Sequence, residues 1–282
     1  MTESTIIFGK DVATKQSWND SVSQSVTDFV NDLHVRIIKH EGLSLEFDLI
    51  NSTPALSNAL RSILTSEIRW YAFHDVFISQ NDSIFPDEYL AHRIGLIPVK
   101  LKASETFQTV DYYLKVSNNT KETINVYSNS IVSTIEILDI QKDVLICKLA
   151  PKNTISMKLR IAEGIGKTHV KWSPVALCTF RLLPHIKLNR KFTGKDAVRL
   201  KNACSQGVIE IVNDEAFVKN PRLETMSREV LREFSDGSVE LSRVAGHYCF
   251  CVEGLLENPL VILQKAILVL KEKATNLSNQ LV

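Results

Sequence analysis

Alternating apolar and polar side chains mark the first structured part of the chain. An apolar run at 35–39 is followed by a turn at Gly42. After that turn, apolar residues alternate with polar ones at four positions: Leu43, Leu45, Phe47 and Leu49. Because successive side chains of a strand point to opposite faces, this pattern predicts a half-buried antiparallel hairpin.

Helical spacing replaces the alternation after this hairpin. Thr53 followed by Pro54 is typical of a helix start, because a threonine side chain caps well and proline needs no N–H donor there. The apolar residues that follow form one stripe: Leu56, Ala59, Leu60, Ile63 and Leu64. We therefore predict an amphipathic helix from Thr53 to Ile68.

A second helix start, Asn258 followed by Pro259, opens the last segment, where we predict a helix from Pro259 to Leu281. Its apolar residues recur every three or four positions: Leu260, Leu263, Ile267, Leu270, Ala274, Leu277 and Leu281. The first half of this helix is apolar on further sides, so it needs two packing partners. One partner is its own sheet, and the other is a second subunit or another part of this chain. A fully internal helix fits the pattern equally well.

The middle of the chain has mainly strand patterns, with one short charged helix that ends at Gly95. Extended runs are predicted at four places: 72–79, 112–116, 124–127 and 144–146. Alternation returns from Ile155 to Ile161, and again on a strand from Tyr248 to Val252. The sequence thus predicts an α+β fold in which a mostly antiparallel β-rich domain is inserted into the first domain.

Composition restricts the classes of function. The chain has 282 residues, 44% of them hydrophobic, and a net charge of +1, so a large core is expected and a dominant nucleic-acid surface is not. The five cysteines show no disulfide spacing, which is typical of a reducing compartment. The apolar runs are too short to span a bilayer. We expect a soluble intracellular protein, without a secretory signal, whose first 28 residues form a polar arm tethered by Trp18.

Metal and cofactor sites are not expected. Cys249 and Cys251 share one face of a strand, but zinc needs four ligands and no second pair accompanies them. Buried apolar roles suit these cysteines better. The segment from Gly164 to Thr168 has the Gly-Lys-Thr of a phosphate loop, but Ile161 stands where the first glycine is required.

One group of polar residues is of the types used in acid–base chemistry. Glu88 and His92 are four residues apart on the predicted charged helix, beside Asp87, and His169 follows much later. These types could act as general acids or bases, or as metal ligands. We favour capping and ion pairs, because no nucleophile or glycine-rich loop accompanies them.

Several motifs resemble those of the α-like subunits of cellular RNA polymerases. The early matches are Asn58-Ala59-Leu60-Arg61-Ser62-Ile63, the loop 81–83, and the long motif at 87–98. Later matches lie at 164–175, 181–186 and 222–231. The last two resemble the larger α-like subunit shared by eukaryotic RNA polymerases I and III. The chain departs from the family pattern at Ser62, at Ile68-Arg69 and in the shortened loop.

The resemblance implies a division of the chain into four parts. A polar arm at 1–29 precedes a discontinuous dimerisation domain, an antiparallel sheet plus two helices, at 30–70, 173–184 and 237–282. The inserted β-rich domain covers 71–172. A second insert at 185–236 is a ferredoxin-like remnant, and it retains only Cys204 of the thiolates that an iron–sulfur cluster needs.

The resemblance also implies a function. The chain would be a non-catalytic assembly subunit of nuclear and nucleolar RNA polymerases I and III, without cofactor, membrane contact or much nucleic-acid contact. It would pair with a smaller α-like subunit through nine apolar residues: Leu56, Ala59, Leu60, Ile63, Leu64, Leu260, Leu263, Ile267 and Leu270. The pair would dock the two largest subunits through six charged residues: Arg61, Asp87, Glu88, His92, Arg93 and Lys171.

Three alternatives stay open. The chain could be the equivalent subunit of another polymerase, of the Pol II or archaeal type. It could be a homodimeric binding module, as in the bacterial α relative. It could be a stand-alone hydrolase that uses Glu88, His92 and His169.

Overall fold

The computed structural model describes most of the chain: residues 6–8, 13–15, 25–102, 107–108, 110–133 and 135–280. Trp18 and Leu281 lie outside the described residues, so their expected roles stay predictions. The chain divides into two units, the first comprising 1–38, 46–57 and 179–250, and the second 39–45, 58–178 and 251–282. The domain limits expected from the resemblance stay a prediction.

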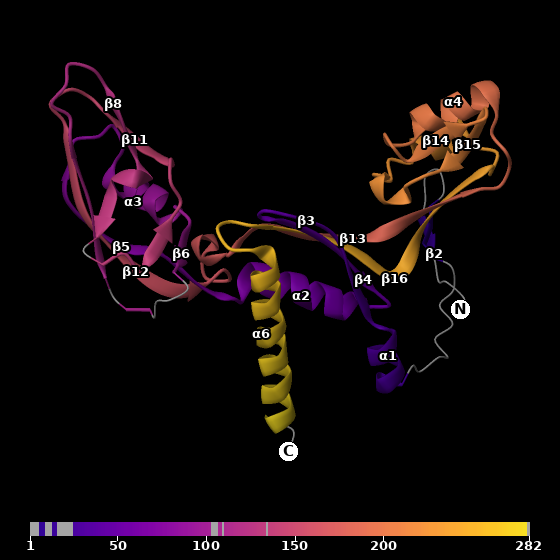
Figure 1. Ribbon diagram of the computed structural model, residues 1–282, viewed down its shortest axis with the longest axis horizontal. Helices are drawn as coiled ribbons and strands as arrows, with labels where there is room; N and C mark the ends of the chain where they lie inside the picture. The colour runs from indigo at the N-terminus through magenta and orange to yellow at the C-terminus, as the bar shows by residue number, and fades with distance from the viewer. Residues whose placement is uncertain are drawn as a thin grey trace. The chain divides into compact units, whose positions relative to one another are not determined.

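The first unit is based on part of a long sheet. Among the described residues this sheet has six strands, in the order β2-β1-β16-β4-β3, and β13 also pairs with β16. Figure 1 labels five of them, β2, β3, β4, β13 and β16. The strands are β1 Ile6–Phe8, β2 Ala13–Lys15, β3 His34–Glu41, β4 Ser44–Ile50, β13 Val175–Leu188 and β16 Val239–Gly254. A short helix, α1 Val26–Asp32, precedes β3.

The hairpin predicted from alternation is confirmed as β3 and β4. Leu45, Phe47 and Leu49 of β4 are buried, whereas every residue of β3 is exposed. The Phe47 ring stacks on Phe250 of β16, with ring centroids 4.8 Å apart. The alternating residues of β4 therefore supply one face of the core of the first unit.

The first unit also contains a small module between β13 and β16. Its elements are α4 Gly194–Ala203, β14 Ile209–Val212, β15 Glu215–Val218, η3 Pro221–Leu223 and α5 Glu229–Glu233. Asn213 and Asp214, which join β14 to β15, both have positive φ, as a type I′ hairpin turn requires. Phe192, Leu200 and Val208 are fully buried in the separate core of this module.

Both predicted helix starts are confirmed. The α2 helix spans Pro54–Ser66, and Thr53 Oγ1 accepts a hydrogen bond from the Leu56 N–H at 3.2 Å. The α6 helix spans Pro259–Gln280, and Asn258 Oδ1 accepts from the Leu260 N–H at 2.9 Å. Both prolines occupy the first helical position, where a missing N–H costs nothing.

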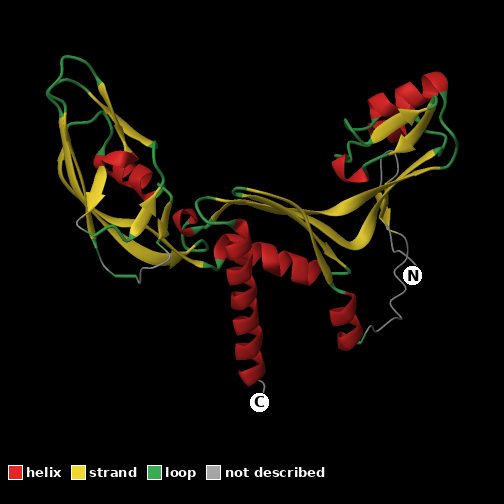
Figure 2. Cartoon of the chain, viewed as in Figure 1, coloured by secondary structure: helices red, strands yellow, loops and turns green. Residues whose placement is uncertain are grey.

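Most of the second unit is the β-rich part of the chain, and Figure 2 shows its strands around the short helix α3. Among the described residues, a four-stranded sheet runs β5-β12-β7-β9, beside the pairs β10-β6 and β11-β8. The elements are β5 Arg69–Asn81, α3 Asp87–Gly95, β6 Val99–Leu101, β7 Asp111–Ser117, β8 Ile124–Tyr127, η1 Ser128–Ser130, β9 Ile131–Ser133, β10 Leu138–Ile140, β11 Leu145–Leu149, β12 Thr154–Ile165 and η2 Val170–Trp172. The alternating apolar residues of β12 lie in the core of this β-rich part: Ile155, Met157, Leu159 and Ile161.

These elements confirm the α+β fold class. Helices and antiparallel strand pairs both contribute to each unit. No helix in the described part of the chain is long and apolar enough to cross a membrane.

Candidate assembly surfaces

The apolar stripe of α2 lies mostly inside the chain itself. Leu60, Ile63 and Leu64 are buried, while Leu56 and Ala59 are half-buried. Side chains that are already covered offer little surface to another molecule. The pattern predicted an amphipathic helix correctly, but the burial of these residues arises within this chain.

The α6 helix has a different environment. Ile262 and Ala266 are buried, whereas every residue of 271–280 is exposed. Lys273 Nζ lies 2.7 Å from Glu67 Oε2, an ion pair that links the exposed half of the helix to the residue after α2. The fully buried residues of α6 therefore all lie in its first two turns.

Apolar side chains remain on the uncovered part of α6. The spacing of three and four residues puts one set on a single side of the helix: Leu263, Ile267, Leu270, Ala274 and Leu277. We call this set the α6 stripe. Ile267 is 52% exposed and Leu277 is 60% exposed, while Leu263 and Leu270, like Leu260 before them, are half-buried. Leu268, which the sequence reasoning did not select, is also exposed.

The second candidate surface surrounds α3. Asp87, Glu88 and His92 are exposed, and the Asp87 carboxylate accepts a hydrogen bond from the Asn81 amide at 2.7 Å. The rings of His92 and His169 are brought together, with centroids 6.1 Å apart. Three of the six charged residues predicted to contact large subunits thus face solvent here.

Arg93 and Lys171 have internal partners instead. Arg93 donates to the carbonyl oxygens of Leu145 and Ile146, at 2.7 and 3.0 Å, and so links α3 to β11. Lys171 Nζ donates to the Phe73 carbonyl oxygen at 3.0 Å. Burial lowers the pKa of Lys171, because an ammonium loses hydration there.

Arg61, the sixth predicted contact, donates to Asn58 Oδ1 at 3.0 Å on the same helix.

Exposed apolar residues that the sequence reasoning missed lie before, along and directly after α3. Ile84 is 86% exposed in the loop, Tyr89 is exposed on the helix, and Leu96 is exposed directly after it. An apolar residue within a polar loop is the one sequence signal that could have identified Ile84. The surface is therefore apolar as well as charged.

The Gly164-Ile165-Gly166 motif packs closely against other parts of its unit. A Cβ on Gly164 would overlap the Trp172 indole, and a Cβ on Gly166 would overlap the Thr65 carbonyl oxygen. Lys167 N–H donates to the Ser66 carbonyl oxygen at 2.8 Å. Gly164 allows close approach of the Trp172 indole and Gly166 allows close approach of the end of α2, which explains the motif without a phosphate ligand.

A polar cluster occupies the first unit, where Arg222 donates to the Asp48 carboxylate and His247 Nε2 lies 3.0 Å from Asp48 Oδ2. Burial alone would raise the pKa of Asp48, but the hydrogen bonds from Arg222 and His247 outweigh it and lower that pKa. Asp48, His247 and Cys249 offer ligand atoms within 4.8 Å of one another.

The donor set of this cluster does not suit a metal ion. Burial raises the pKa of the Cys249 thiol to about 12, so the thiolate that binds zinc is disfavoured. The Asp48 carboxylate is already paired with the Arg222 guanidinium. We interpret the cluster as an ion-pair network that joins the module to β4 and β16.

Comparisons with known proteins agree with the motif analysis. Residues 76–175 match the family model described as the RNA polymerase Rpb3/RpoA insert domain. The Saccharomyces cerevisiae protein named DNA-directed RNA polymerases I and III subunit RPAC1 is 34% identical over 318 residues, which cover 96% of this chain and 92% of the yeast protein. The Homo sapiens protein of that name is 33% identical over 297 residues, 90% of this chain and 86% of the human one.

A relative from other polymerases is less similar. The Arabidopsis thaliana protein named DNA-directed RNA polymerases II, IV and V subunit 3 is 27% identical over 271 residues, covering 81% of this chain and 85% of that protein. The similarity to the yeast and human proteins extends well beyond the matched insert domain, because it covers 96% and 90% of this chain.

Proposed function

The chain belongs to the family of RPAC1 subunits of DNA-directed RNA polymerases I and III, and we propose that it is an assembly subunit of these two enzymes. It has no reaction of its own in this role. It contributes by holding other chains in place, so its function depends on its surfaces. The alternatives of a Pol II or archaeal type subunit are less favoured, because the Pol II, IV and V relative is less similar.

The α6 stripe is the observation that supports a pairing function. Apolar side chains that stay exposed along a helix at three-four spacing are typical of a helix that packs on another helix. The partner in this proposal is a smaller α-like subunit, which lays an apolar helix along the stripe. An obligate interface of this type buries on the order of 2,000 Å².

The α2 helix contributes to this pairing mainly through support. Leu60, Ile63 and Leu64 stay in the core, while Leu56 and Ala59 keep part of their surface. The Lys273–Glu67 ion pair connects the end of α2 to α6. The partner therefore meets mainly α6.

The surface around α3 is the proposed docking site for the two largest subunits. Asp87, Glu88 and His92 supply exposed polar groups, and Ile84 supplies apolar area. Arg93 and Lys171 support this surface indirectly, because their hydrogen bonds fix α3 to β11 and η2 to β5. A rigid support of this kind keeps the entropic cost of docking low.

The proposed role places the chain in the nucleus, including the nucleolus, where it helps transcribe ribosomal, transfer and other small RNAs. It makes little or no direct contact with nucleic acid, in keeping with its net charge of +1. It touches no membrane and holds no cofactor.

The test is affinity purification of the tagged full-length chain from nuclear extract, with mass spectrometry of the co-purifying chains. We expect the largest subunits of both polymerases and a smaller α-like chain in comparable amounts. Recovery of the chain alone would refute the proposal. Substrate turnover by the purified chain, lost on His92→Ala, would favour the hydrolase alternative.

A further inference from the structure

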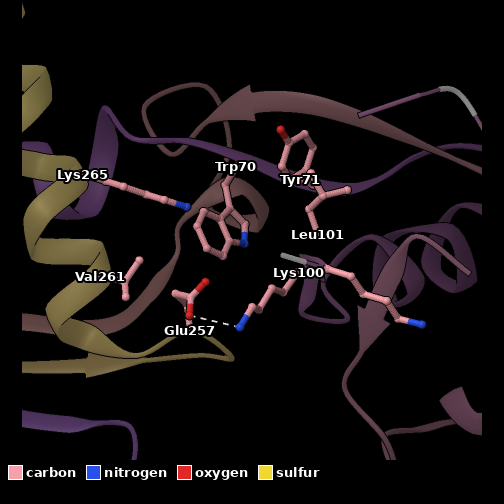
Figure 3. A pocket seen from close by; sticks show the side chains of 8 residues that line it. Trp70, Tyr71, Lys100, Leu101, Glu257, Val261 and Lys265 are labelled. Atoms are coloured by element: carbon pink, nitrogen blue, oxygen red, sulfur yellow. Dashed lines mark hydrogen bonds and ion pairs between the residues drawn. The ribbon is translucent and has the colours of Figure 1, made fainter. Parts of the chain in front are cut away.

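A pocket of about 400 Å³ lies in the second unit, at the start of α6 (Figure 3). Its walls come from β5, β6, the turn after β16 and the first turns of α6. Eight residues line it: Trp70, Tyr71, Lys100, Leu101, Lys102, Glu257, Val261 and Lys265. No role described above uses this pocket.

Lys265 carries the unmatched charge of the pocket. Its Nζ lies over the Trp70 ring, 4.7 Å from the ring centroid, as Figure 3 shows. Its side chain is exposed, and it takes part in none of the ion pairs found among the described residues. The indole face holds the ammonium in position at the mouth of the pocket.

The other two lysines of the pocket have acidic partners. Lys100 Nζ lies 3.0 Å from Glu257 Oε1, and both side chains are largely buried. Lys102 Nζ lies 3.4 Å from Glu136 Oε2. With these two acidic partners counted, Lys265 leaves one unmatched positive charge at the pocket, which attracts a carboxylate.

The aromatic residues of the pocket are not arranged to bind nucleic acid. Trp70 is only 5% exposed, and its Nε1 donates to the Val99 carbonyl oxygen at 3.0 Å. Tyr71 is already stacked on Phe107, with centroids 5.1 Å apart. Single-stranded nucleic acid requires open aromatic faces on which bases can stack. The available wall is instead aliphatic, formed by Leu101 and Val261.

We propose that this pocket binds an acidic peptide segment of another chain in the polymerase. A carboxylate of the segment accepts a charge-assisted hydrogen bond from Lys265, and a neighbouring aliphatic side chain packs on Val261 and Leu101. The proposal rests on the proposed function only in that the segment belongs to a chain assembled with this one. The pocket lies beside the first turns of α6, so the same assembly brings a second chain close to it.

Carbodiimide coupling of the purified complex tests the proposal, because this reagent joins a lysine amine directly to a carboxylate that touches it. We expect peptides in which Lys265 is linked to an aspartate or glutamate of another chain. We also expect Lys265 to be protected from amine acetylation in the complex, by about tenfold relative to the free chain. Lys115, exposed on β7, serves as the control that stays reactive in both states.

Charge variants provide a second measurement. Lys265→Glu should speed dissociation of the chain that supplies the acidic segment by about tenfold, equal to about 1.4 kcal/mol. Lys265→Arg should leave the dissociation rate unchanged. The matched variant Lys115→Glu should have no effect. Unchanged thermal unfolding of the free Lys265→Glu chain excludes misfolding as the cause.

Each other outcome overturns the proposal. If the polymerase chains co-purify but Lys265 stays reactive, or couples only to its own chain, the pocket proposal fails and the proposed function stands. If protection of Lys265 disappears on ribonuclease treatment, the occupant is RNA and not a peptide. If no other chain co-purifies, both proposals fail together.

Discussion

The guanidinium of Arg222 donates a hydrogen bond to the Asp48 carboxylate, although 174 positions separate the two residues in the chain. Arg222 belongs to η3 of the small module, and Asp48 belongs to β4 of the sheet. Both side chains are largely buried, and His247 contacts the second carboxylate oxygen. The module is therefore held to the sheet by a charged group that is costly to leave unpaired.

Removing this arginine should destabilise the first unit strongly. Arg222→Ala leaves the buried Asp48 carboxylate without its main partner, which costs about 3–5 kcal/mol. Urea unfolding of the purified chain measures the loss. Lys219→Ala breaks the exposed pair with Glu210 and should cost less than about 1 kcal/mol. Equal effects of the two variants would contradict the structural role given to Arg222.

The stability of the first unit should fall in acid because of Asp48. The folded pKa of Asp48 lies below its ordinary value of 3.8, so the carboxylate stabilises the fold above pH 3.8. That stability is lost as the pH falls below 3.8 and through the folded pKa. Measurements of the free energy of unfolding from about pH 6 to about pH 2 should show the loss. Asp48→Asn should make this free energy depend less on pH. A variant with the same acid sensitivity as the parent chain would disprove the assignment.

A single methyl group at Gly166 should disturb the second unit. Gly166→Ala places a Cβ against the Thr65 carbonyl oxygen, a rigid backbone atom, and overpacking of this kind costs about 1–3 kcal/mol. Gly95→Ala is the control, since its Cβ would meet only ordinary contacts. Thermal unfolding compares them. If Gly166→Ala were as stable as Gly95→Ala, close packing would not explain the Gly-Ile-Gly motif.

A charge introduced on the buried face of α2 and one introduced on the exposed face of α6 should affect stability differently. Leu60→Asp puts a charge into the core and should unfold the second unit, because a buried unpaired carboxylate costs several kcal/mol. Ile267→Asp places the same charge on an exposed face and should leave the free energy of unfolding within about 0.5 kcal/mol. Circular dichroism of the free chains separates the two cases. A folded, stable Leu60→Asp chain would show that α2 is not buried as described.

The sequence predicted the elements well where local chemistry decides them. Thr53 with Pro54 and Asn258 with Pro259 set both helix starts, because capping and a fixed φ act within a few residues. Alternation set the hairpin for the same reason, since strand side chains must point to opposite faces. The polymerase family was predicted from the motifs and is confirmed by the yeast and human relatives.

The sequence pattern could not predict what surrounds each side chain in the fold. A stripe at helical spacing shows that one face is covered, but it does not distinguish coverage by the same chain, as at Leu60, from coverage by a partner. The family resemblance implied that Arg93 and Lys171 contact the large subunits, and that stays a prediction. Their hydrogen bonds to backbone carbonyls far along the chain could not be read from the sequence. The pocket beside Lys265 joins residues from β5, β6 and α6, a juxtaposition that no local pattern encodes.

The central claim is that a different α-like chain covers the α6 stripe, and sedimentation equilibrium tests it most directly. Co-expressed with a smaller α-like subunit, this chain should sediment as a one-to-one heterodimer. The double variant Ile267→Asp with Leu277→Asp should sediment as a folded monomer, while Val198→Asp, an equally exposed site on α4, should still pair. A double variant that pairs normally, or a parent chain that forms only a homodimer, would contradict the account.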